Sequence, residues 1–560
     1  MKKLLHAAIR ARQSLLCAVV LTAIGALPAA AQTRIAITYP ASLSAKPLNG
    51  RVFFYVAGPE PPGTRVRRFR RGPREPRFEI GDQVGSQQFF GKDVLAWKPG
   101  QPALIDSSIY GYPVTSLAML PAGDYTVQAL FNRYTTFHRA GGHTLLLPQD
   151  DGEGQQMTSK PGNFYSVPMK VHLDPRHPGT LRLELTKVIP PIPPPPDTKW
   201  IKHVRIQSPL LTKFWGQPMY VEAAVVLPEG FYTHPHAHYP LMLEQGHFRY
   251  DLKGGFDRIK TEWLAGKLPK FLWVYIDTAN PYYDDSYAVN SANLGPYGDA
   301  ITQELIPAVE RKFRGIGQGW ARVDYGCSTG GWEALADQIF YPDYFNGAWG
   351  SSPDPVDFRY FQIVNIYKDA NAYWLRGPWS PVPRPDQRNP DGSIVQTMAR
   401  ANHRELVLGT HGRSGDQWDI WQAVFGPAGP NGYPADIWNP LTGKINHQVA
   451  QYWHDHFDLD VYLNTHWSTL APKLDGKLHV YVGDMDSYYL NDAVYLMQKT
   501  IAAHRDPAIT ASFTFGRLQP HCFDGTYHKM SEEQLYMPQM KARILATAPH
   551  GADLSWNYNH

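Results

Sequence analysis

Residues 323–335, VDYGCSTGGWEAL, hold the side chains of this sequence that are best suited to nucleophilic chemistry. Cys327 and Ser328 are adjacent within a Gly-x-Ser-x-Gly pattern whose glycines are Gly326 and Gly330. An apolar run precedes the pattern and a helical pattern follows it, and between a strand and a helix it predicts a sharp turn that exposes its central side chain. A Cβ at either glycine would collide with the neighbouring strand and helix. This geometry selects Ser328 as the nucleophile.

A serine hydroxyl is unreactive at its ordinary pKa, so the chain must also supply a base and an acid that orients it. The segment VGDMDSYYL ends a predicted strand and offers Asp484 and Asp486. We prefer Asp486, because it lies further into the loop where an acid can reach a histidine, and Asp484 remains the alternative. The later segment GRLQPHCFDGTYH offers His521 and His528 as the base.

The cysteines decide between the two histidines. Cys17 falls in a predicted export signal, which leaves Cys327 and Cys522 in a chain sent to an oxidising compartment, where a disulfide between them is the expected state. A disulfide brings the neighbours of its cysteines within several ångströms of each other, and those neighbours are Ser328 and His521. The bond closes a loop of 522 − 327 = 195 residues. The chain-entropy model gives roughly 5 kcal/mol for such a loop, as an upper figure.

The motif YGCSTGGWEAL and the later His-Cys pair resemble the Cys-Ser, Asp, His-Cys arrangement of the tannase and feruloyl esterase family. The resemblance implies an α/β-hydrolase fold with Ser328, Asp486 and His521 as a catalytic triad. It also implies a disulfide between the cysteines beside the catalytic serine and histidine. Gly483 and Asp486 match the Gly and Asp of the family's acid-bearing loop.

A second resemblance covers more of the chain. YPLMLEQGHF, NLGPYGDAITQELIPAVERKFR and STGGWEALADQIFYPDYFNGAWGSS are similar to the esterase D and enterochelin-esterase-like group of α/β-hydrolases. Together the two resemblances cover roughly residues 215–355 and 475–545. The remaining segments match neither group.

An oxyanion hole needs two hydrogen-bond donors. We expect the backbone N–H of Thr329, directly after the nucleophile, to be one of them. Related esterases place His-Gly in the loop that gives the second donor, whereas this sequence has Gln245-Gly246-His247. Because the donor is a backbone group, the exchange is tolerated, and we assign it to the N–H of His247.

The elements that position these residues follow from the pattern along the chain. After a proline-rich linker, apolar runs alternate with helical patterns, which predicts a mostly parallel sheet with helices on both faces, the α/β-hydrolase core. Before the linker, short apolar runs separated by Gly, Pro and Asp turns predict an all-β, sandwich-like domain. The expected organisation is a signal peptide at 1–31, a β domain at 32–188, a linker at 189–199, core segments at 200–352 and 476–560, and an insertion at 353–475.

Strand candidates of the core are apolar runs bounded by turn residues, at 219–228, 239–245, 271–277, 321–326, 345–350, 477–483 and 509–516. The insertion at 353–475 fits none of these positions and is rich in tryptophan. We interpret it as a lid or substrate wall, and a scaffold whose aromatics form a core of their own is the open alternative.

Two further segments allow a functional interpretation. His234, His236 and His238 alternate in THPHAHYP and could bind a metal, but the flanking prolines favour a plain turn, so we predict no metal site. NPYYDDSY, residues 280–287, follows a predicted strand, and substrate contact or a plain loop are equally compatible with it.

Composition and the N-terminus limit the class of protein. Residues 1–31 have a basic start, an apolar run and small residues before Gln32, which predicts a cleaved signal and a secreted or periplasmic protein. Removing four positive charges takes the formal charge from +4 to about zero, so nothing global points to nucleic acid or an anionic membrane.

These patterns together predict a serine hydrolase of carboxylic esters that needs no cofactor. Its expected partners are small-molecule or glycan-linked esters, with an aromatic acyl group as one candidate, and neither nucleic acid nor stable membrane insertion. An acyltransferase of the same fold and a non-catalytic binding module on a hydrolase scaffold are the alternatives. The oligomeric state stays open.

Overall fold

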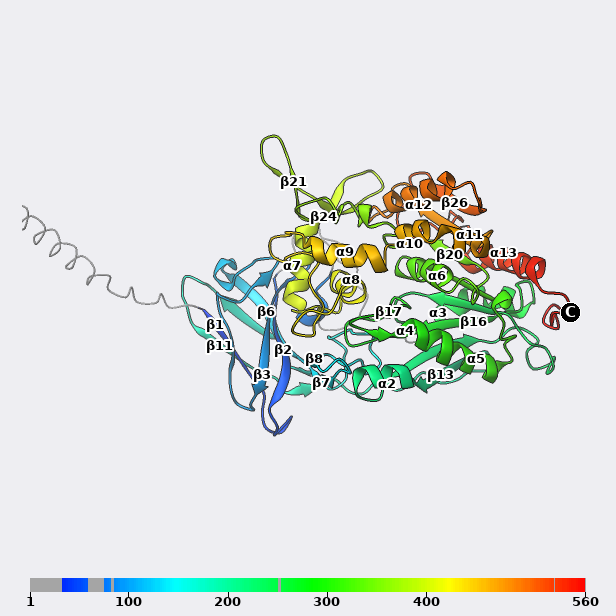
Figure 1. Ribbon diagram of the computed structural model, residues 1–560. Helices are drawn as coiled ribbons and strands as arrows, with labels where there is room; N and C mark the ends of the chain where they lie inside the picture. The colour runs from blue at the N-terminus through cyan, green and yellow to red at the C-terminus, as the bar shows by residue number, and fades with distance from the viewer. Residues whose placement is uncertain (1–32, 59–74, 82–84, 250–252, 528, 559–560) are drawn as a thin grey trace, which may run out of the picture.

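The computed structural model describes residues 33–58, 75–81, 85–249, 253–527 and 529–558. The predicted signal at 1–31 and the alternative base His528 lie outside the described residues. In Figure 1 the N-terminal β strands occupy one end of the molecule and the chain's C-terminus lies at the other. None of the helices in the described residues is long and apolar enough to cross a bilayer.

The N-terminal region is all-β, as predicted. Its two sheets enclose an apolar core that includes Ile35, Phe54, Phe90 and Phe131. The smaller sheet has the order β11 (Thr180–Glu184), β1 (Arg34–Thr38), β4 (Ala103–Ile105). The larger has the order β12 (Lys187–Val188), β9 (Phe164–Tyr165), β6 (Gly123–Arg133), β2 (Leu48–Ala57), β3 (Gln88–Trp97), β5 (Gly111–Tyr112), and β10 (Met169–Leu173) pairs with β6.

A hairpin of this region belongs to the other core. β7 (Thr135–His138) and β8 (Thr144–Leu147) form a separate two-stranded sheet. Phe137, Leu145 and Leu147 are fully buried against the large apolar core of the second half of the chain. The β region is therefore packed onto the rest of the molecule.

The second half is built on an eight-stranded sheet in which neighbours are not sequential. The order is β13 (Ile201–Gln207), β14 (Tyr220–Val226), β16 (Leu272–Asp277), β15 (Leu241–Gln245), β19 (Arg322–Cys327), β20 (Ala348–Ser351), β25 (Leu478–Gly483), β26 (Ala511–Gly516). The first two pairings are antiparallel and all the others are parallel. This sheet, with a strand–turn–helix elbow after β19, confirms the predicted α/β-hydrolase fold.

Helices lie between successive strands of this sheet and after its last strand, β26. They are α2 (Pro209–Trp215), α3 (Lys253–Leu264), α4 (Tyr297–Asp299), α5 (Ile306–Phe313), α6 (Thr329–Phe340), α12 (Asn491–Ala503) and α13 (Glu532–Thr547). A π-helical segment, Ala300–Leu305, joins α4 to α5. Helix α6 packs on β15, β19 and β20, which fixes the start of the helix beside the centre of the sheet.

The insertion between β20 and β25 folds as short hairpins followed by helices, and in Figure 1 much of it lies between the N-terminal β strands and the core of the second half. Its elements are β21 (Trp374–Arg376), β22 (Pro381–Pro383), β23 (Pro385–Arg388), β24 (Ile394–Thr397), α7 (Met398–Leu408), α8 (Gln417–Phe425), α9 (His447–His456), α10 (Leu459–Thr465) and α11 (Trp467–Leu474).

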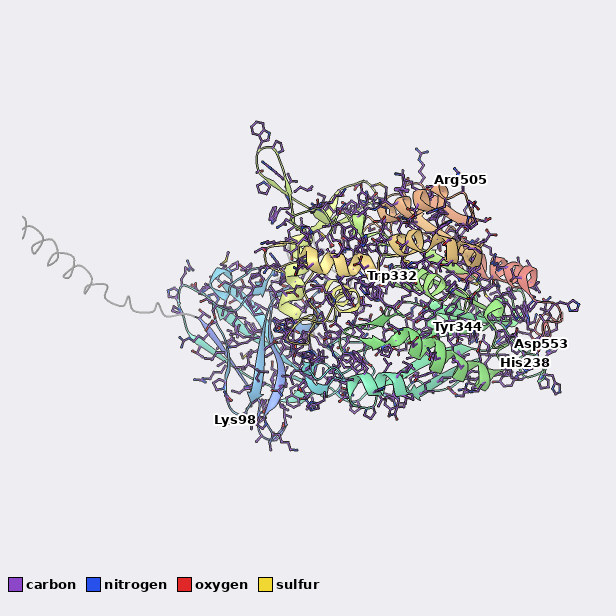
Figure 2. All side chains as sticks on the ribbon, viewed as in Figure 1. Lys98, His238, Trp332, Tyr344, Arg505 and Asp553 are labelled. Atoms are coloured by element: carbon purple, nitrogen blue, oxygen red, sulfur yellow. A yellow bond between two sulfur atoms is a disulfide. The ribbon has the colours of Figure 1, made fainter. Side chains whose placement is uncertain are left out.

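Most tryptophans of the insertion are buried in a core continuous with that of the sheet, namely Trp418, Trp421, Trp438, Trp453 and Trp467. Phe425 of α8 packs on Trp332 of α6, with ring centroids 5.0 Å apart, and Trp332 lies in the middle of the molecule in Figure 2. Trp379, by contrast, is 96% exposed. The aromatics thus serve largely as a scaffold core, while α7 packs on β3 and β5 of the N-terminal region.

Candidate active site

Ser328 lies at a strained turn between β19 and α6. Its backbone has φ 85° and ψ −111°, a region that residues other than glycine rarely adopt. The Ser328 N–H donates to Ser351 O at 3.0 Å, and the Asp354 N–H donates to Ser328 O at 3.0 Å. These bonds anchor the turn to the end of β20 and hold the serine side chain at the carboxyl edge of the sheet.

The two glycines of the motif are needed for the reason predicted. A Cβ on Gly326 would lie 2.6 Å from the Gly330 carbonyl carbon, and a Cβ on Gly330 would lie 2.2 Å from Gln245 O. Both contacts are with backbone atoms, which cannot move aside as a flexible side chain can. The close approach of α6 to β15 that brings Ser328 and the Gln245-Gly246-His247 loop together therefore requires glycine.

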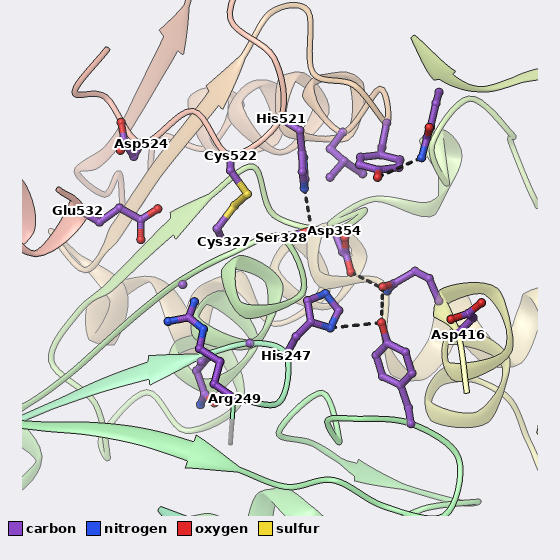
Figure 3. Close-up of a pocket in the computed structure, with 18 of the residues that line it drawn as sticks. His247, Arg249, Cys327, Ser328, Asp354, Asp416, His521, Cys522, Asp524 and Glu532 are labelled. Atoms are coloured by element: carbon purple, nitrogen blue, oxygen red, sulfur yellow. Dashed lines mark hydrogen bonds between the residues drawn. A yellow bond between two sulfur atoms is a disulfide. The ribbon is translucent and has the colours of Figure 1, made fainter. Parts of the chain in front are cut away.

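The structure brings Ser328, His521 and Asp486 into one chain of hydrogen bonds. Ser328 Oγ lies 2.9 Å from His521 Nε2, and His521 Nδ1 lies 2.9 Å from Asp486 Oδ2. Figure 3 shows the first of these contacts, with His521 descending onto the serine from the loop after β26. This is the spatial relation that a Ser-His-Asp relay requires.

The two charged members of this chain shift each other's pKa. Burial raises the pKa of Asp486, but His521 and the backbone N–H groups of Tyr488 and Leu490 lower it more, so the net pKa is below the ordinary range. Burial lowers the pKa of His521, but Asp486 and more weakly Asp354 raise it, so the net pKa is above the ordinary range. The geometry favours an ionised acid beside a histidine of raised basicity.

Asp484, the alternative acid, has a different position. Its Oδ1 accepts a hydrogen bond from the Leu518 N–H at 2.6 Å, in the turn that follows β26. It thus supports the loop that carries His521, whereas the Asp486 carboxylate contacts the imidazole itself.

The structure contains a disulfide between Cys327 and Cys522, whose Cα atoms are 5.7 Å apart. Figure 3 shows the sulfur bridge beside the Ser328–His521 contact. Because each cysteine is the immediate chain neighbour of Ser328 or His521, the crosslink restricts the separation of those two side chains directly.

Thr329 and His247, the predicted donors of the oxyanion hole, come after β19 and β15, which are neighbouring strands of the sheet. Thr329 is the first residue of α6, and the N–H groups of a helix's first turn have no carbonyl partner within the helix. His247 follows β15 and Gly246, whose φ is 135°. The segments that carry the two residues meet at the close contact between Gly330 and Gln245.

A pocket of about 1080 Å³ opens at the serine. Its lining includes Ser328, His521, His247 and two tryptophans of the insertion, Trp418 and Trp421. The insertion is therefore a wall of this pocket as well as a scaffold, so both interpretations of it describe part of its structure.

The sequence did not indicate a network of hydrogen bonds that joins the insertion to the site. The Tyr283 hydroxyl donates to Gln417 Oε1 at 2.8 Å, and Gln417 Nε2 donates to Asp354 Oδ2 at 3.3 Å. Tyr287 and Thr329 also donate to that Asp354 oxygen, at 2.6 and 3.2 Å. Asp354 follows β20 at the carboxyl edge of the sheet, and this position was the signal available in the sequence.

Arg388 of β23 is another residue that the sequence did not indicate. Its Nε donates to Asp486 O at 2.9 Å, and its Nη2 donates to Asn491 Oδ1 at 2.9 Å. The guanidinium also lies 4.2 Å from the ring centroid of Tyr489. The insertion therefore holds the loop that carries Asp486.

The alternating histidines of THPHAHYP do not gather around a common point in the described residues. His234 stacks on Tyr558 at a centroid distance of 3.7 Å, and His238 Nδ1 contacts Asp553 Oδ2 at 2.8 Å. Figure 2 shows this second pair at the end of the molecule that carries the C-terminus. The other open segment, residues 280–287, does reach the pocket, through Tyr283.

Comparison with protein-family models gives no match, and comparison with curated protein sequences gives none either. Among solved structures, the chain is similar to a ferulic acid esterase at 13% identity and a TM-score of 0.35, over 62% of this chain and 98% of that one. It is also similar to an S-formylglutathione hydrolase from Agrobacterium tumefaciens at 12% identity and a TM-score of 0.34, over 62% and 97%. A third is Est1E from Butyrivibrio proteoclasticus, at 10% identity and a TM-score of 0.29, over 59% and 94%. Similarities at this level carry no argument about function.

Proposed function

We propose that the protein is an exported serine hydrolase that cleaves carboxylic esters through an acyl-enzyme. The observation that carries the proposal is the pair of 2.9 Å contacts from Ser328 Oγ to His521 Nε2 and from His521 Nδ1 to Asp486 Oδ2. Export is supported by the disulfide, which is a bond of oxidising compartments.

The proposed mechanism assigns one role to each group. Ser328 Oγ attacks the ester carbonyl while His521 Nε2 takes its proton, and Asp486 stabilises the imidazolium and fixes its tautomer. The N–H groups of Thr329 and His247 bind the oxygen that becomes negative. His521 then protonates the leaving alcohol. In the second half of the reaction His521 takes a proton from water, which attacks the acyl-enzyme, and returns that proton to Ser328 Oγ as the acid is released.

The pocket supports an ester larger than acetate. Its volume of about 1080 Å³ accommodates a bulky acyl or alcohol group, and its lining combines tryptophan with amide side chains such as Gln387, Gln396 and Gln417. An aromatic acyl group or a carbohydrate-linked ester is the substrate class we propose for it.

The test is labelling with a fluorophosphonate, together with hydrolysis of p-nitrophenyl acetate, methyl ferulate and methyl gallate. We expect wild type to take the label and cleave at least one ester, and Ser328→Ala to do neither. A wild-type protein that takes no label and cleaves none of these esters would refute the proposal. Product analysis with an added alcohol or sugar separates a hydrolase from an acyltransferase.

A further inference from the structure

The side chain of His247 is a second imidazole in the pocket of Ser328. Its Nδ1 contacts Asp284 Oδ1 at 3.1 Å, Asp285 Oδ2 at 3.4 Å and the hydroxyl oxygen of Tyr283 at 3.2 Å. The Tyr283 hydroxyl gives its proton to Gln417 Oε1, so it accepts from His247. Because all three groups are acceptors, Nδ1 carries a proton.

The other ring nitrogen of His247 faces the pocket. Figure 3 shows it directed toward Ser328 and Asp354, on the opposite side of the serine from His521. His521 is already engaged with Ser328 Oγ, so the two imidazoles do not compete for one role. The geometry leaves Nε2 of His247 free to meet a substrate atom bound at the serine.

The surroundings favour the charged form of this ring. Burial lowers the pKa of His247, but the hydrogen bonds and charges of Asp284 and Asp285 raise it well above its ordinary value. Asp285 is 2% exposed and its Oδ2 lies 3.4 Å from His247 Nδ1, so a protonated imidazole offsets the cost of burying that carboxylate. Burial raises the pKa of Asp284 to about 7, so at pH 8 that carboxyl is ionised.

Charged groups of other elements also face His247. Asp354, after β20, and Glu333 of α6 are within its electrostatic range and are negative when ionised. His521 lies on the far side of the serine and is repelled by the His247 charge when both rings are protonated. When they are ionised, Asp354 and Glu333 favour the protonated form of His247, whereas a protonated His521 disfavours it.

We propose that the side chain of His247 is a catalytic residue, whose Nε2–H donates to the ester's carbonyl oxygen as that oxygen becomes negative. This rests on the proposed function and adds a third donor to the backbone N–H groups of Thr329 and His247. A charged donor fixed before the reaction stabilises the tetrahedral oxyanion more than the neutral carbonyl, so its effect falls on kcat rather than on KM.

The experiment compares His247→Gln with wild type at pH 8 on p-nitrophenyl acetate. Glutamine retains a polar side chain but has no charge, and we expect kcat to fall by on the order of 100-fold with KM within about threefold. Phenylboronic acid, which forms a tetrahedral adduct with the serine, should lose affinity in the variant. His238→Gln is the matched control, because His238 pairs with Asp553 far from the site and its loss should leave kcat unchanged.

Two further experiments distinguish oxyanion stabilisation by His247 from binding of an acyl carboxylate and from binding of a metal ion. A mono-p-nitrophenyl ester of succinic acid should lose as much kcat as the acetate does; a loss confined to the succinate would overturn the proposal, because His247 would then bind the acyl carboxylate. His247, Asp284 and Asp285 also offer three ligand atoms within 4.8 Å of one another. Wild-type activity that is abolished by EDTA and restored by Zn²⁺ would assign the cation to a metal and overturn the proposal.

A second variant covers the case in which His247→Gln does not fold. Asp285→Asn keeps the imidazole but removes one carboxylate, so kcat should fall less and its decline at high pH should begin at a lower pH, where His247 loses its proton. Unchanged kcat and an unchanged alkaline limb in Asp285→Asn, or unchanged kcat in a folded His247→Gln, would overturn the proposal. Fluorophosphonate labelling of both variants reports on Ser328 independently, so this failure is distinct from a failure of the esterase function.

Discussion

The guanidinium of Arg388 holds the backbone of Asp486, with its Nε donating to Asp486 O at 2.9 Å. Arg388 belongs to the insertion and Asp486 to the core, so this bond crosses the boundary between them. Its Nη2 also donates to the Asp484 carbonyl at 3.3 Å, which makes the arginine a clamp on the whole loop.

Replacing Arg388 with alanine should therefore impair catalysis without touching the substrate. Hydrogen bonds from a charged group contribute about 1.5–3 kcal/mol each, and loss of the three to Asp484 O, Asp486 O and Asn491 Oδ1 should loosen the loop that carries Asp486 and lower kcat by at least about tenfold. Arg376→Ala, an exposed position of β21 in the same insertion, is the control. Equal kcat for both variants would show that the clamp is dispensable.

Substitution of Asp484 and of Asp486 should have different effects on kcat. Asp486→Asn keeps the shape of the side chain but allows the wrong tautomer of His521, so kcat should fall by about 10⁴-fold. Asp484→Asn keeps an oxygen that accepts from the Leu518 N–H and loses only its charge, so it should lower the free energy of unfolding by no more than about 1 kcal/mol and leave most of kcat. Steady-state kinetics and urea unfolding on the same preparations decide the assignment, and the reverse ranking of kcat would name Asp484 as the acid.

The acidic limb of the pH profile should lie above the ordinary histidine pKa of about 6.5. In the proposed mechanism His521 acts as the neutral base, and its pKa is raised, so kcat/KM should fall as the pH drops through that raised value. The effect on stability has the opposite sign: a group with a raised folded pKa stabilises most below its unfolded pKa, and that stability is lost as the pH rises through the folded pKa. Activity should thus be lost near pH 5.5 with no loss of Tm from this group. A limb at or below pH 6.5, in kcat/KM or in the rate of fluorophosphonate labelling, would contradict this.

Removing the disulfide should affect both activity and stability. In Cys327→Ser/Cys522→Ser the free energy of unfolding should fall by about 2–5 kcal/mol, because the unfolded chain regains the freedom of a loop 195 residues long. Because His521 would no longer be held next to Ser328, kcat should fall by about 10- to 100-fold. Wild type treated with iodoacetamide without reductant is the control and should retain full activity. Unchanged kcat in the double variant would mean that the loop holds His521 without the crosslink.

Gly330→Ala should prevent the elbow from forming normally. Its Cβ would lie 2.2 Å from Gln245 O, and forced overlap with backbone costs about 3 kcal/mol or more. Gly141→Ala adds the same methyl where nothing lies within 4 Å and should be nearly neutral. Thermal unfolding of the pair gives the comparison, and equal Tm values would show that the elbow tolerates the atom.

What the sequence predicts well is local chemistry. Ser328 is expected at the elbow because the glycine pattern, the strand and the helix are contiguous, and Asp486 and His521 are expected near it because each follows a strand at the sheet's carboxyl edge. The cysteines add one long-range distance, which is why His521 could be preferred to His528. The fold class followed from the alternation of strand and helix patterns.

Long-range contacts of loops and edges escaped prediction. Arg388 and Gln417 reach the site from an insertion with no recognisable pattern, and nothing local distinguishes them from other polar residues. The edge strand Ile201–Gln207 was not predicted either, because only Ile201 and Val204 of its side chains are buried and its polar positions hide the alternation. The positions of such residues depend on tertiary packing, which cannot be deduced from a single sequence.

Gln417 donates to Asp354 and accepts from Tyr283, so one side chain of the insertion completes the contacts around the serine and the second imidazole. An engineer who exchanged this insertion for another, in order to accept a different ester, would remove that side chain and Arg388 together. In the proposed enzyme, exchanging the insertion would therefore change substrate specificity and turnover together. A chimera would need Gln417 and Arg388 restored before the effect of its new pocket on specificity could be measured.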